Sequence, residues 1–397
     1  MNTKELILGA ETYLANTYRR APMVLVRGKG TRVWDTDGKE YRDFLSGIGV
    51  NNLGHCHPAV VEAIREQATR LLHVSNLYHI EPQTRLGRLL VENSFADQAF
   101  FCNSGAEANE AAIKLARLYS HKHYGENRHE ILVMENSFHG RTLATLTATG
   151  QSKHWEGFAP LVPGFRYLPF GDPAATEKAV SPQTCAILVE PIQGEGGVQI
   201  PPGNYLRDLR DLCNRHDLLL IYDEVQTGMG RTGTLFAYEG FGVPPDMMTL
   251  AKSLAGGMPI GALLAKEEIM AAFTPGSHAS TFGGNPLVSA AAVASVNVLL
   301  EESLLANCRR VGEYFLDRLR DRQNSYPFIK EVRGKGLIIG IELDFPGTPL
   351  VDTFRERGYL INCTADRVLR FLPPLIVTEE EVDGLIAVLD EVFETCQ

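Results

Sequence analysis

Several kinds of segment are missing from this sequence of 397 residues, and each absence excludes a class of protein. No apolar run approaches the roughly 20 residues that span a bilayer. The apolar stretch in MNTKELILGAETYLAN, at the start of the chain, has charges at both ends, so it is no signal peptide. Basic residues form no block of five or six, and 38 Lys and Arg face 48 Asp and Glu. We therefore expect no membrane segment and no nucleic-acid partner.

The N-terminal stretch MNTKELILGAETYLAN is better explained as an amphipathic helix, whose apolar stripe is Leu6, Ala10, Tyr13 and Leu14.

The cysteines form no CxxC pair, and their number is odd. The seven residues are widely spaced along the chain: Cys56, Cys102, Cys185, Cys213, Cys308, Cys363 and Cys396. This usage favours a reducing cytoplasm, with buried thiols in place of a disulfide framework. The HCH string at residues 55–57 lacks a second pair of Cys or His at zinc-finger spacing, so we expect no metal site.

Internal repeats, low-complexity tracts and linkers are also absent, and the composition is that of a globular protein, with 44% hydrophobic residues. Between residues 24 and 45 apolar and polar residues alternate, which predicts a small antiparallel meander. After Pro58, helical stripes alternate with short, wholly apolar runs, which predicts a mostly parallel sheet with helices on both faces. The runs are AFFC, ILVM, AILVE, LLLIY and MMTLA, and the stripes cover residues 58–73, 82–93, 106–121 and 205–216.

From about Asn285 the pattern changes to two helical stretches, three shorter strand-like segments and a closing helix that begins at Glu379. We expect an α/β fold, in which a large α/β domain is flanked by a smaller α+β domain that the two ends of the chain build together. The expected parts are an N-terminal segment packing with the small domain (1–50), the large domain (51–285) and the C-terminal small domain (286–397).

A single lysine, Lys252, follows the apolar run MMTLA and precedes a glycine pair, in the stretch TLAKSLAGGMPIG. Ligands of open parallel sheets bind at the carboxyl ends of the strands, which is where Lys252 is expected. Taken alone, such a lysine more often ends a strand and points into water, because lysine is rarely buried unless it is paired. This segment by itself therefore leaves the role of Lys252 open.

The string NSGAEANE follows AFFC and leads directly into a helical stripe. The free N–H groups and the positive dipole end of that helix would hold a phosphate. A plain helix cap by Asn103 or Ser104 explains the same residues equally well.

Two patterns nearby suggest other chemistry and are rejected. GMGRTG, residues 228–233, fits the dinucleotide pattern GxGxxG, but it is separated from the strand end and no apolar helix follows it. Asp223 and Glu224 are adjacent on a predicted strand and point to opposite faces, so they cannot flank one glycosidic bond.

One cofactor requires three of these features together. A pyridoxal phosphate site needs a lysine that forms a Schiff base, a helix N-terminus for the phosphate and a carboxylate that keeps the pyridine nitrogen protonated. Lys252, the NSGAE turn and Asp223 supply all three, each at the end of a predicted strand. Their convergence favours a chemical role for Lys252.

Eight longer strings resemble those of the ornithine-type (class III) aminotransferases, a pyridoxal phosphate family of fold-type I. They are GHCHP, CNSGAEANEAAIKLAR, NSFHGRT, VEPIQGEGGV, DEVQTGMGRTG, TLAKSLAGGMPIGA, STFGGNPL and EVRGKGLIIGIEL. The likeness runs in order from about Pro22 to the last helix. It implies the fold-type I architecture, with a mostly parallel seven-stranded sheet between helices in the large domain and a smaller α+β domain beside it.

The resemblance also implies which residues hold the cofactor, pyridoxal 5'-phosphate. Lys252 would bind it covalently and then shuttle a proton, and Asp223 would pair with the pyridine nitrogen. The other implied contacts are Gln226 at the ring oxygen, Phe138 and Val225 on the ring faces, and Ser104, Gly105 and Ala106 at the phosphate. Thr281 would reach the phosphate of the neighbouring subunit's cofactor, so a homodimer is implied.

Four further residues would bind the substrates. Arg141 and Ser280 would hold the far end of the substrate, where the planar fork of arginine suits a carboxylate. Arg370 would take the α-carboxylate of 2-oxoglutarate, and Glu195 would neutralise Arg370 when the donor has no carboxylate there. The alternative for Arg141, Arg370 and Glu195 is a solvated or structural ion pair.

The implied reaction moves the δ-amino group of N2-acetyl-L-ornithine onto 2-oxoglutarate, giving N-acetylglutamate 5-semialdehyde and glutamate, in arginine biosynthesis. Ornithine aminotransferases carry a tyrosine where Ile48 stands, and an isoleucine better suits an acylated, uncharged α-nitrogen. Ornithine, succinylornithine, succinyl-diaminopimelate and 4-aminobutyrate remain alternative donors. An aminomutase of the same fold and a non-catalytic ligand-binding relative remain alternative functions.

Overall fold

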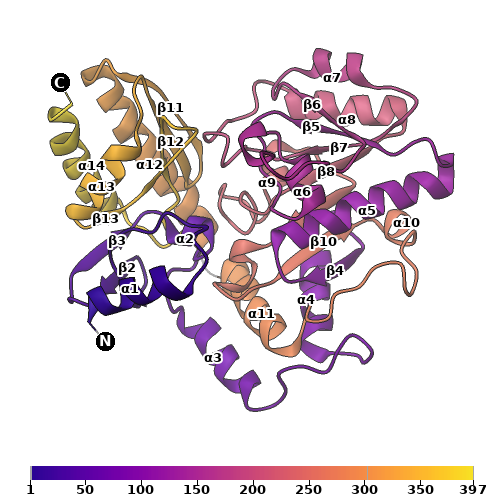
Figure 1. The fold of residues 1–397 in the computed structure, drawn as a ribbon. Helices are drawn as coiled ribbons and strands as arrows, with labels where there is room; N and C mark the ends of the chain where they lie inside the picture. The colour runs from indigo at the N-terminus through magenta and orange to yellow at the C-terminus, as the bar shows by residue number, and fades with distance from the viewer. Residues whose placement is uncertain (1, 302, 397) are drawn as a thin grey trace.

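The structure, a computed structural model, describes residues 2–301 and 303–396. The middle of the chain forms one lobe, and the two ends of the chain lie together in the other (Figure 1). The described residues form three sheets, one of seven strands and two of four.

The seven-stranded sheet has the order β4-β10-β9-β8-β7-β5-β6. All neighbours from β9 to β6 pair in parallel, whereas β10 is antiparallel to both β9 and β4. The mostly parallel sheet predicted from the apolar runs is thereby confirmed. The bounds are β4 (Gln98–Cys102), β5 (Glu130–Met134), β6 (Phe165–Leu168), β7 (Thr184–Val189), β8 (Leu219–Asp223), β9 (Met247–Leu250) and β10 (Gly261–Ala265).

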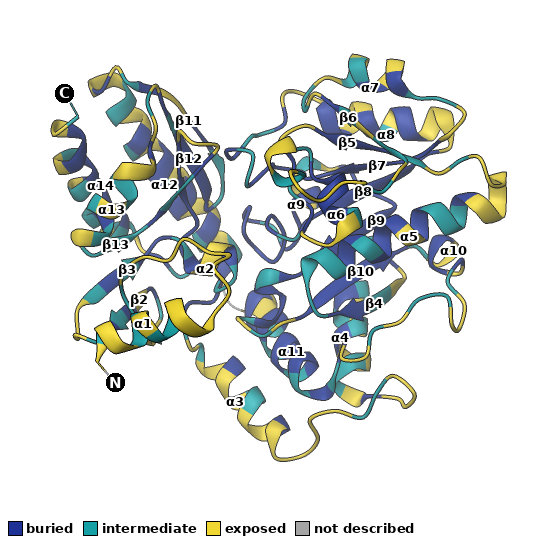
Figure 2. Cartoon of the chain, in the orientation of Figure 1, coloured by how far each residue is buried: buried dark blue, intermediate teal, exposed yellow. Residues whose placement is uncertain are grey.

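Both faces of this sheet are covered by helices, which explains why its strands show no alternation of polarity. In β8, Ile221 faces the apolar cluster that contains α5, whereas Leu220 and Tyr222 face the cluster that contains α8. The strands are accordingly buried along most of their length (Figure 2). The helices of this lobe are α3 (Pro58–Ala68), α4 (Glu81–Glu92), α5 (Gly105–Tyr124), α6 (Leu143–Ala148), α7 (Pro173–Ala179), α8 (Tyr205–His216), α9 (Ala237–Phe241), α10 (Glu267–Met270) and α11 (Pro286–Glu301).

The other lobe combines segments from both ends of the chain. The predicted meander forms from β1 (Leu25–Lys29), β2 (Arg32–Asp35) and β3 (Glu40–Asp43), and β13 (Tyr359–Leu360) adds to it in parallel beside β3. A second antiparallel sheet has the order β11-β12-β15-β14. Its strands are β11 (Ile329–Lys335), β12 (Ile338–Leu343), β14 (Asn362–Thr364) and β15 (Val368–Phe371), packed with α12 (Leu304–Ser325), α13 (Thr348–Glu356) and α14 (Glu379–Glu394). The domain boundaries at residues 50 and 285 stay predictions, and α11 itself packs against α3 and α4.

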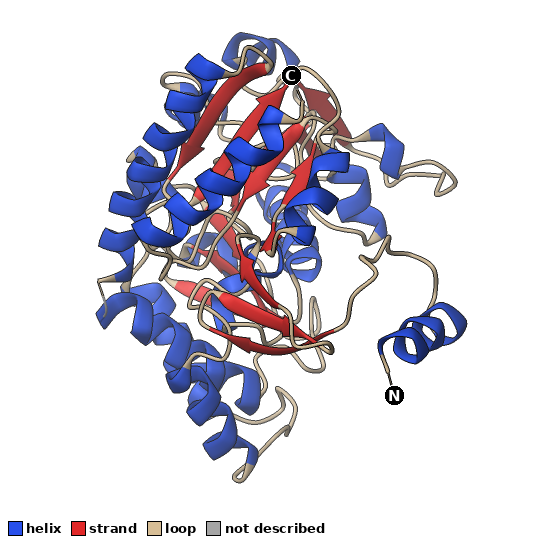
Figure 3. Ribbon diagram, turned by 90° about the vertical axis from the view of Figure 1, so that its left-hand side faces the viewer, coloured by secondary structure: helices blue, strands red, loops and turns tan. Residues whose placement is uncertain are grey.

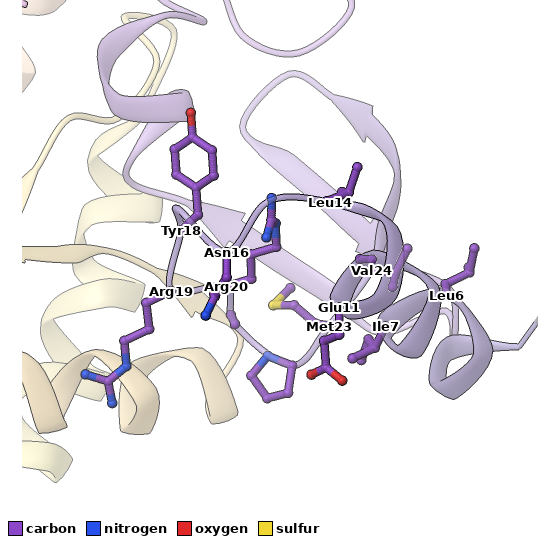
Figure 4. Close-up of a pocket in the computed structure, with 13 residues that line it drawn as sticks. Leu6, Ile7, Glu11, Leu14, Asn16, Tyr18, Arg19, Arg20, Met23 and Val24 are labelled. Carbon is purple, nitrogen blue, oxygen red and sulfur yellow. The ribbon is translucent and has the colours of Figure 1, made fainter. Parts of the chain in front are cut away.

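The first helix, α1 (Thr3–Tyr13), forms where the sequence predicts it and begins with a capping box between Asn2 and Glu5. It stands apart from the body of the chain (Figure 3), and none of its residues is buried. Of the predicted stripe, Tyr13 is 86% exposed and Leu14 54% exposed. A cavity of about 700 Å³ lies between α1 and the segment that follows it (Figure 4). This cavity is larger than the one described below, but it does not include any of the predicted site residues.

Four of the seven cysteines are buried, two are intermediate and Cys56 is exposed, and all are free thiols. The expectation of buried thiols is thus wrong for Cys56.

Across the described ranges, no single helix has the length and hydropathy needed to cross a bilayer; α11 and α12 meet that test only as a pair, bent by 67°.

Candidate active site

A cavity of about 250 Å³ opens where β8 and β9 end. It gathers most of the residues that the sequence singles out, although they come from widely separated segments. Its wall includes Gly105, Ala106, Phe138, Arg141, Glu195, Asp223, Val225, Gln226 and Lys252. The carboxyl end of a parallel sheet therefore holds the chemistry-bearing side chains, as the strand-end rule predicts.

Lys252 comes two residues after the end of β9 and begins a 3₁₀ turn, Lys252–Ala255. Its backbone has a φ of 42°, in the left-handed region that non-glycine residues rarely adopt. Burial lowers the pKa of Lys252 below its ordinary value of 10.5, and the carboxylates of Glu195 and Asp223 act in the opposite direction. A lowered pKa increases the fraction of neutral amine, which is the form that attacks a carbonyl. The side chain lies in the cavity wall, so it is not the solvated strand-end lysine that the segment alone allowed.

Asp223, the last residue of β8, is 3% exposed and is held by three donors. Its Oδ2 accepts hydrogen bonds from Nδ2 of Asn109 and Nδ1 of His139, both at 2.7 Å, and its Oδ1 accepts one from the N–H of Val225 at 3.0 Å. A carboxylate has about four acceptor positions. One remains for a donor in the cavity, which is what a protonated ring nitrogen would require.

The N-terminus of α5 forms one end of the cavity, and both explanations of the NSGAE string fit it. Ser104 caps the helix, because its Oγ accepts from the N–H of Glu107 at 3.2 Å. Gly105 and Ala106 are the first helical residues and line the cavity, and N–H groups at such positions have no partner within the helix. A Cβ on Gly105 would lie 2.8 Å from Cγ1 of Val225, so only glycine fits there. The site thus offers a close backbone approach and free donors to an anion.

Phe138 and Val225 both line the cavity, as expected of residues that contact the faces of a ring. The guanidinium of Arg141 lies 5.4 Å from the centre of the Phe138 ring and also borders the cavity. Arg141 is exposed, so it remains available to an anionic group that enters from solvent.

Arg370 and Glu195 form an ion pair beside the cavity, with Nη1 and Oε1 2.6 Å apart. Gln226 completes a triangle: its Oε1 accepts from Nη1 of Arg370 at 3.2 Å, and its Nε2 donates to Oε1 of Glu195 at 3.3 Å. Burial by itself would raise the pKa of Glu195, but Arg370, Lys252 and the hydrogen bonds lower it below the ordinary 4.5. Glu195 is therefore ionised and neutralises a guanidinium whose side chain is fully buried.

Of the two remaining nitrogens of the Arg370 guanidinium, one has a hydrogen-bond partner among the described residues and one has none. Its Nε donates to Oδ1 of Asn362 at 3.2 Å. Within the described part of the chain, its Nη2 is buried and has no hydrogen-bond partner. An unpaired buried donor is costly, so this nitrogen marks a place where a ligand oxygen would be stabilised.

Ser280 and Thr281 do not line the cavity in the single chain. They lie in the segment between α10 and α11. Oγ of Ser280 accepts from Nδ2 of Asn103 at 3.2 Å and from the N–H of Gly283 at 3.0 Å, whereas Thr281 is exposed.

Four further residues that the sequence analysis does not single out line the cavity: Asn109, His139, Gly140 and Glu190. Asn109 and His139 hold Asp223. Glu190 accepts from the N–H groups of Phe138 and Gly194, and its pKa is raised to about 7 by burial, with His139 lowering it and Asp223 raising it. Glu190 directly follows β7, so the strand-end rule applied to every polar residue would have found it, whereas His139 lies five residues beyond the end of β5.

Comparison with known proteins decides the family, because the family model described as aminotransferase class-III matches residues 13–393. The chain belongs to the class-III aminotransferases. An acetylornithine aminotransferase of Methanocaldococcus jannaschii is 56% identical over 383 residues, which cover 96% of each chain. One from Caldanaerobacter subterraneus is 53% identical over 98% of this chain and 99% of its own.

Solved class-III aminotransferase structures share the fold, and the expected fold-type I architecture is confirmed by them. An ornithine aminotransferase of Toxoplasma gondii superposes with a TM-score of 0.95 at 36% identity, covering 100% of this chain and 96% of its own. A second structure of the T. gondii enzyme is described with PLP at partial occupancy at the active site. An acetylornithine aminotransferase of Elizabethkingia anophelis has a TM-score of 0.91 and 38% identity, covering 99% of both chains.

Proposed function

We propose that this class-III aminotransferase uses pyridoxal phosphate to move the δ-amino group of N2-acetyl-L-ornithine onto 2-oxoglutarate, yielding N-acetylglutamate 5-semialdehyde and glutamate for arginine biosynthesis. The observation that carries the proposal is the convergence of Lys252, Asp223 and the N-terminus of α5 on one cavity, next to the Arg370–Glu195 pair. Relatives named acetylornithine aminotransferase at 56% and 53% identity support the same donor.

The residues present fit the cofactor. Nζ of Lys252 would hold it covalently, the open acceptor position of Asp223 would face its ring nitrogen, and the N–H groups of Gly105 and Ala106 would bind its phosphate. When bound, pyridoxal phosphate supplies a carbonyl that takes up the amino group and a ring that withdraws electrons from the reacting carbon. Phe138 and Val225 would border that ring.

Lys252 then has a second task, which is to move a proton. Its neutral Nζ accepts a proton from the carbon that bears the transferred nitrogen and returns it on the cofactor side. The lowered pKa of Lys252 suits this base role, because less of the amine is already protonated at neutral pH.

The Arg370–Glu195 pair would serve as the switch between the two substrates. N-acetylornithine presents no carboxylate next to the reacting carbon, so Glu195 neutralises Arg370 during the first half-reaction. In the second half-reaction the α-carboxylate of 2-oxoglutarate replaces Glu195. Nη2 of Arg370, which lacks a partner among the described residues, would then complete a two-point contact with that carboxylate.

Glu195→Ala should weaken discrimination against α-amino donors, because glutamate can pair with the freed Arg370. Glutamate should gain at least about tenfold relative to N-acetylornithine, which corresponds to about 1.4 kcal/mol. Arg370→Ala should cripple the 2-oxoglutarate half-reaction far more than amine transfer from N-acetylornithine. Single-turnover spectra of each half-reaction measure both effects, and equal losses in the two halves would show that the pair is not the switch.

Ile48 bears on the choice of donor. It lies in α2 (Ser46–Gly49) with a φ of 63°, a conformation that a β-branched residue adopts only under constraint, and its side chain is 42% exposed. The neighbouring Gly49 lies against Gln226, so this segment borders the switch. An isoleucine offers no hydrogen bond to a free α-amine and suits an acylated one. Ornithine, succinylornithine, succinyl-diaminopimelate and 4-aminobutyrate are the alternative donors.

Steady-state turnover with each donor and 2-oxoglutarate tests the proposal. We expect the highest kcat/KM for N-acetylornithine, and no turnover when 2-oxoglutarate is omitted. A higher value for free ornithine would contradict the donor assignment. Turnover without a keto acid would instead indicate an aminomutase, and the absence of turnover with any donor would favour a non-catalytic ligand-binding protein.

We further propose a homodimer in the cytoplasm, in which Thr281 of one subunit contacts the cofactor phosphate of the other. The exposure of Thr281 in the single chain supports this role. Sedimentation at decreasing protein concentration should show activity falling together with the dimer fraction, and an active monomer that persists on dilution would argue against a shared site.

A further inference from the structure

The loop that carries Glu195 emerges from one lobe and is held by hydrogen bonds to the other lobe. It follows β7 of the seven-stranded sheet and is closed by an antiparallel bridge between Gln193 and Gln199. Oγ1 of Thr364, on β14, donates to the backbone oxygen of Glu195 at 2.5 Å. The backbone of Glu195 itself therefore attaches the loop to the four-stranded sheet β11-β12-β15-β14.

Arg333, on β11 of the same sheet, makes a second attachment. Its Nη2 and Nε donate to the oxygen of Gly197 at 2.7 and 3.0 Å, and its Nε also reaches the oxygen of Val198 at 3.1 Å. Arg333 is 6% exposed, and Nη1 is held at 2.5 Å by Glu342. A buried guanidinium that is paired at one end and bound to two carbonyls at the other is a rigid support.

The loop also packs against this sheet without space to shift. Gly197 has a φ of 101°, and a Cβ there would lie 3.3 Å from the side chains of Ala365 and Val368. A Cβ on Gly340, in β12, would lie 3.1 Å from Cβ of Val198. Glycine on both sides of the contact brings the two backbones together.

The sheet that anchors Glu195 is also the sheet that carries Arg370. Arg370 lies on β15 and pairs with Asn362 of β14, two residues before Thr364. Both partners of the ion pair are thus fixed to one body, so movement between the two lobes need not change the distance between them.

We propose that Thr364 and Arg333 are positioning residues that fix the backbone of residues 195–198 on the sheet that carries Arg370, so that Glu195 opens and closes by rotation of its side chain alone. This inference rests on the proposed switch. Rotamer changes are fast and need little reorganisation, whereas displacement of a loop is slower. A loop that drifts would leave Arg370 open to α-amino donors for part of the time.

The hydrogen bonds of Thr364 and Arg333 to the backbone of residues 195–198 are called the tether below. Thr364→Val tests the tether with a nearly isosteric change that keeps the β-branched shape and removes one donor. We expect the ratio of half-reaction rates for glutamate over N-acetylornithine to rise about threefold to tenfold, as loss of one hydrogen bond of this kind allows. Thr364→Ser keeps the hydroxyl and should restore the parent ratio. The affinity of cofactor-stripped protein for pyridoxal phosphate should be unchanged in both variants, because Thr364 is not among the described residues that line the cavity.

Arg333→Lys provides a second test should Thr364→Val fold poorly. It keeps the positive charge near Glu342 but cannot span both carbonyls, so the ratio should rise in the same direction. Equal losses in both half-reactions, or a ratio within twofold of the parent in both tether variants, would overturn the proposal. If Glu195→Ala also leaves the ratio unchanged, the switch itself fails; if only the tether variants do, the switch stands without the tether.

Discussion

Replacing Lys252 by alanine should abolish transamination and remove the visible absorbance of the lysine-bound cofactor. The substitution deletes both the covalent link and the base at one atom, Nζ. General-base catalysis alone contributes about 10²- to 10⁴-fold, so we expect turnover to fall by more than about 10⁴-fold. The phosphate site at Gly105 and Ala106 is untouched, and cofactor should still bind without forming the link. Absorbance spectra and turnover of the purified variant measure the two effects separately.

Lys266→Ala is a suitable control for this substitution. Lys266 immediately follows β10, has a side chain that is 43% exposed and lies 3.9 Å from Asp246, away from the cavity. It should keep the visible absorbance and near-parent turnover. Turnover of Lys252→Ala within about tenfold of the parent, a barrier change of about 1.4 kcal/mol, would contradict the assignment of Lys252.

Asp223→Asn should have the next largest effect, a loss of at least about 100-fold in turnover with cofactor still bound. A neutral partner no longer favours the protonated pyridine, and a charge-assisted hydrogen bond worth roughly 1.5–3 kcal/mol is lost. The structure adds a second cost. Oδ2 accepts from Asn109 and His139 while Oδ1 accepts from the N–H of Val225, so an amide in either orientation places its NH2 against a donor.

Asp246→Asn separates these two costs. Asp246 is 9% exposed, precedes β9 at its opposite end and accepts from Arg210 and from the N–H of Leu220. The Asp246→Asn variant should be less stable than the parent, without a comparable loss in turnover per folded site. Thermal unfolding and cofactor titration of both variants provide the comparison. A drop of less than about tenfold in Asp223→Asn would mean that Asp223 is not the ring partner.

The strands and the residues at their ends could be predicted because a strand buried on both faces is a short apolar run without alternation of polarity. The run LLLIY is apolar throughout since its residues pack alternately into two clusters, and the polar residue that ends it, Asp223, has to face a ligand or a partner. The same logic identifies Lys252. The apolar runs do not include the edge strand β6, because FRYL carries a charge, nor β10, because GALLA follows a glycine- and proline-rich turn.

The contacts that support the site could not be predicted in the same way. Thr364 and Arg333 follow Glu195 in the chain by more than 130 residues, and no local pattern distinguishes a threonine that donates to a distant carbonyl from any other strand threonine. The resemblance implies a contact of Gln226 with the cofactor alone, whereas in the structure Gln226 joins Glu195 to Arg370. The apolar stripe of α1 predicted the helix, whereas it could not predict that the helix stays exposed in the single chain.

The most direct measurement follows the visible spectrum of the purified holoprotein through one cycle of the proposed reaction. Stoichiometric N-acetylornithine, added without a keto acid, should remove the absorbance of the lysine-bound cofactor and release one equivalent of semialdehyde per site. Addition of 2-oxoglutarate should then restore the original spectrum and yield one equivalent of glutamate. A spectrum that N-acetylornithine leaves unchanged while ornithine bleaches it, or a bleached spectrum that 2-oxoglutarate fails to restore, would contradict the account.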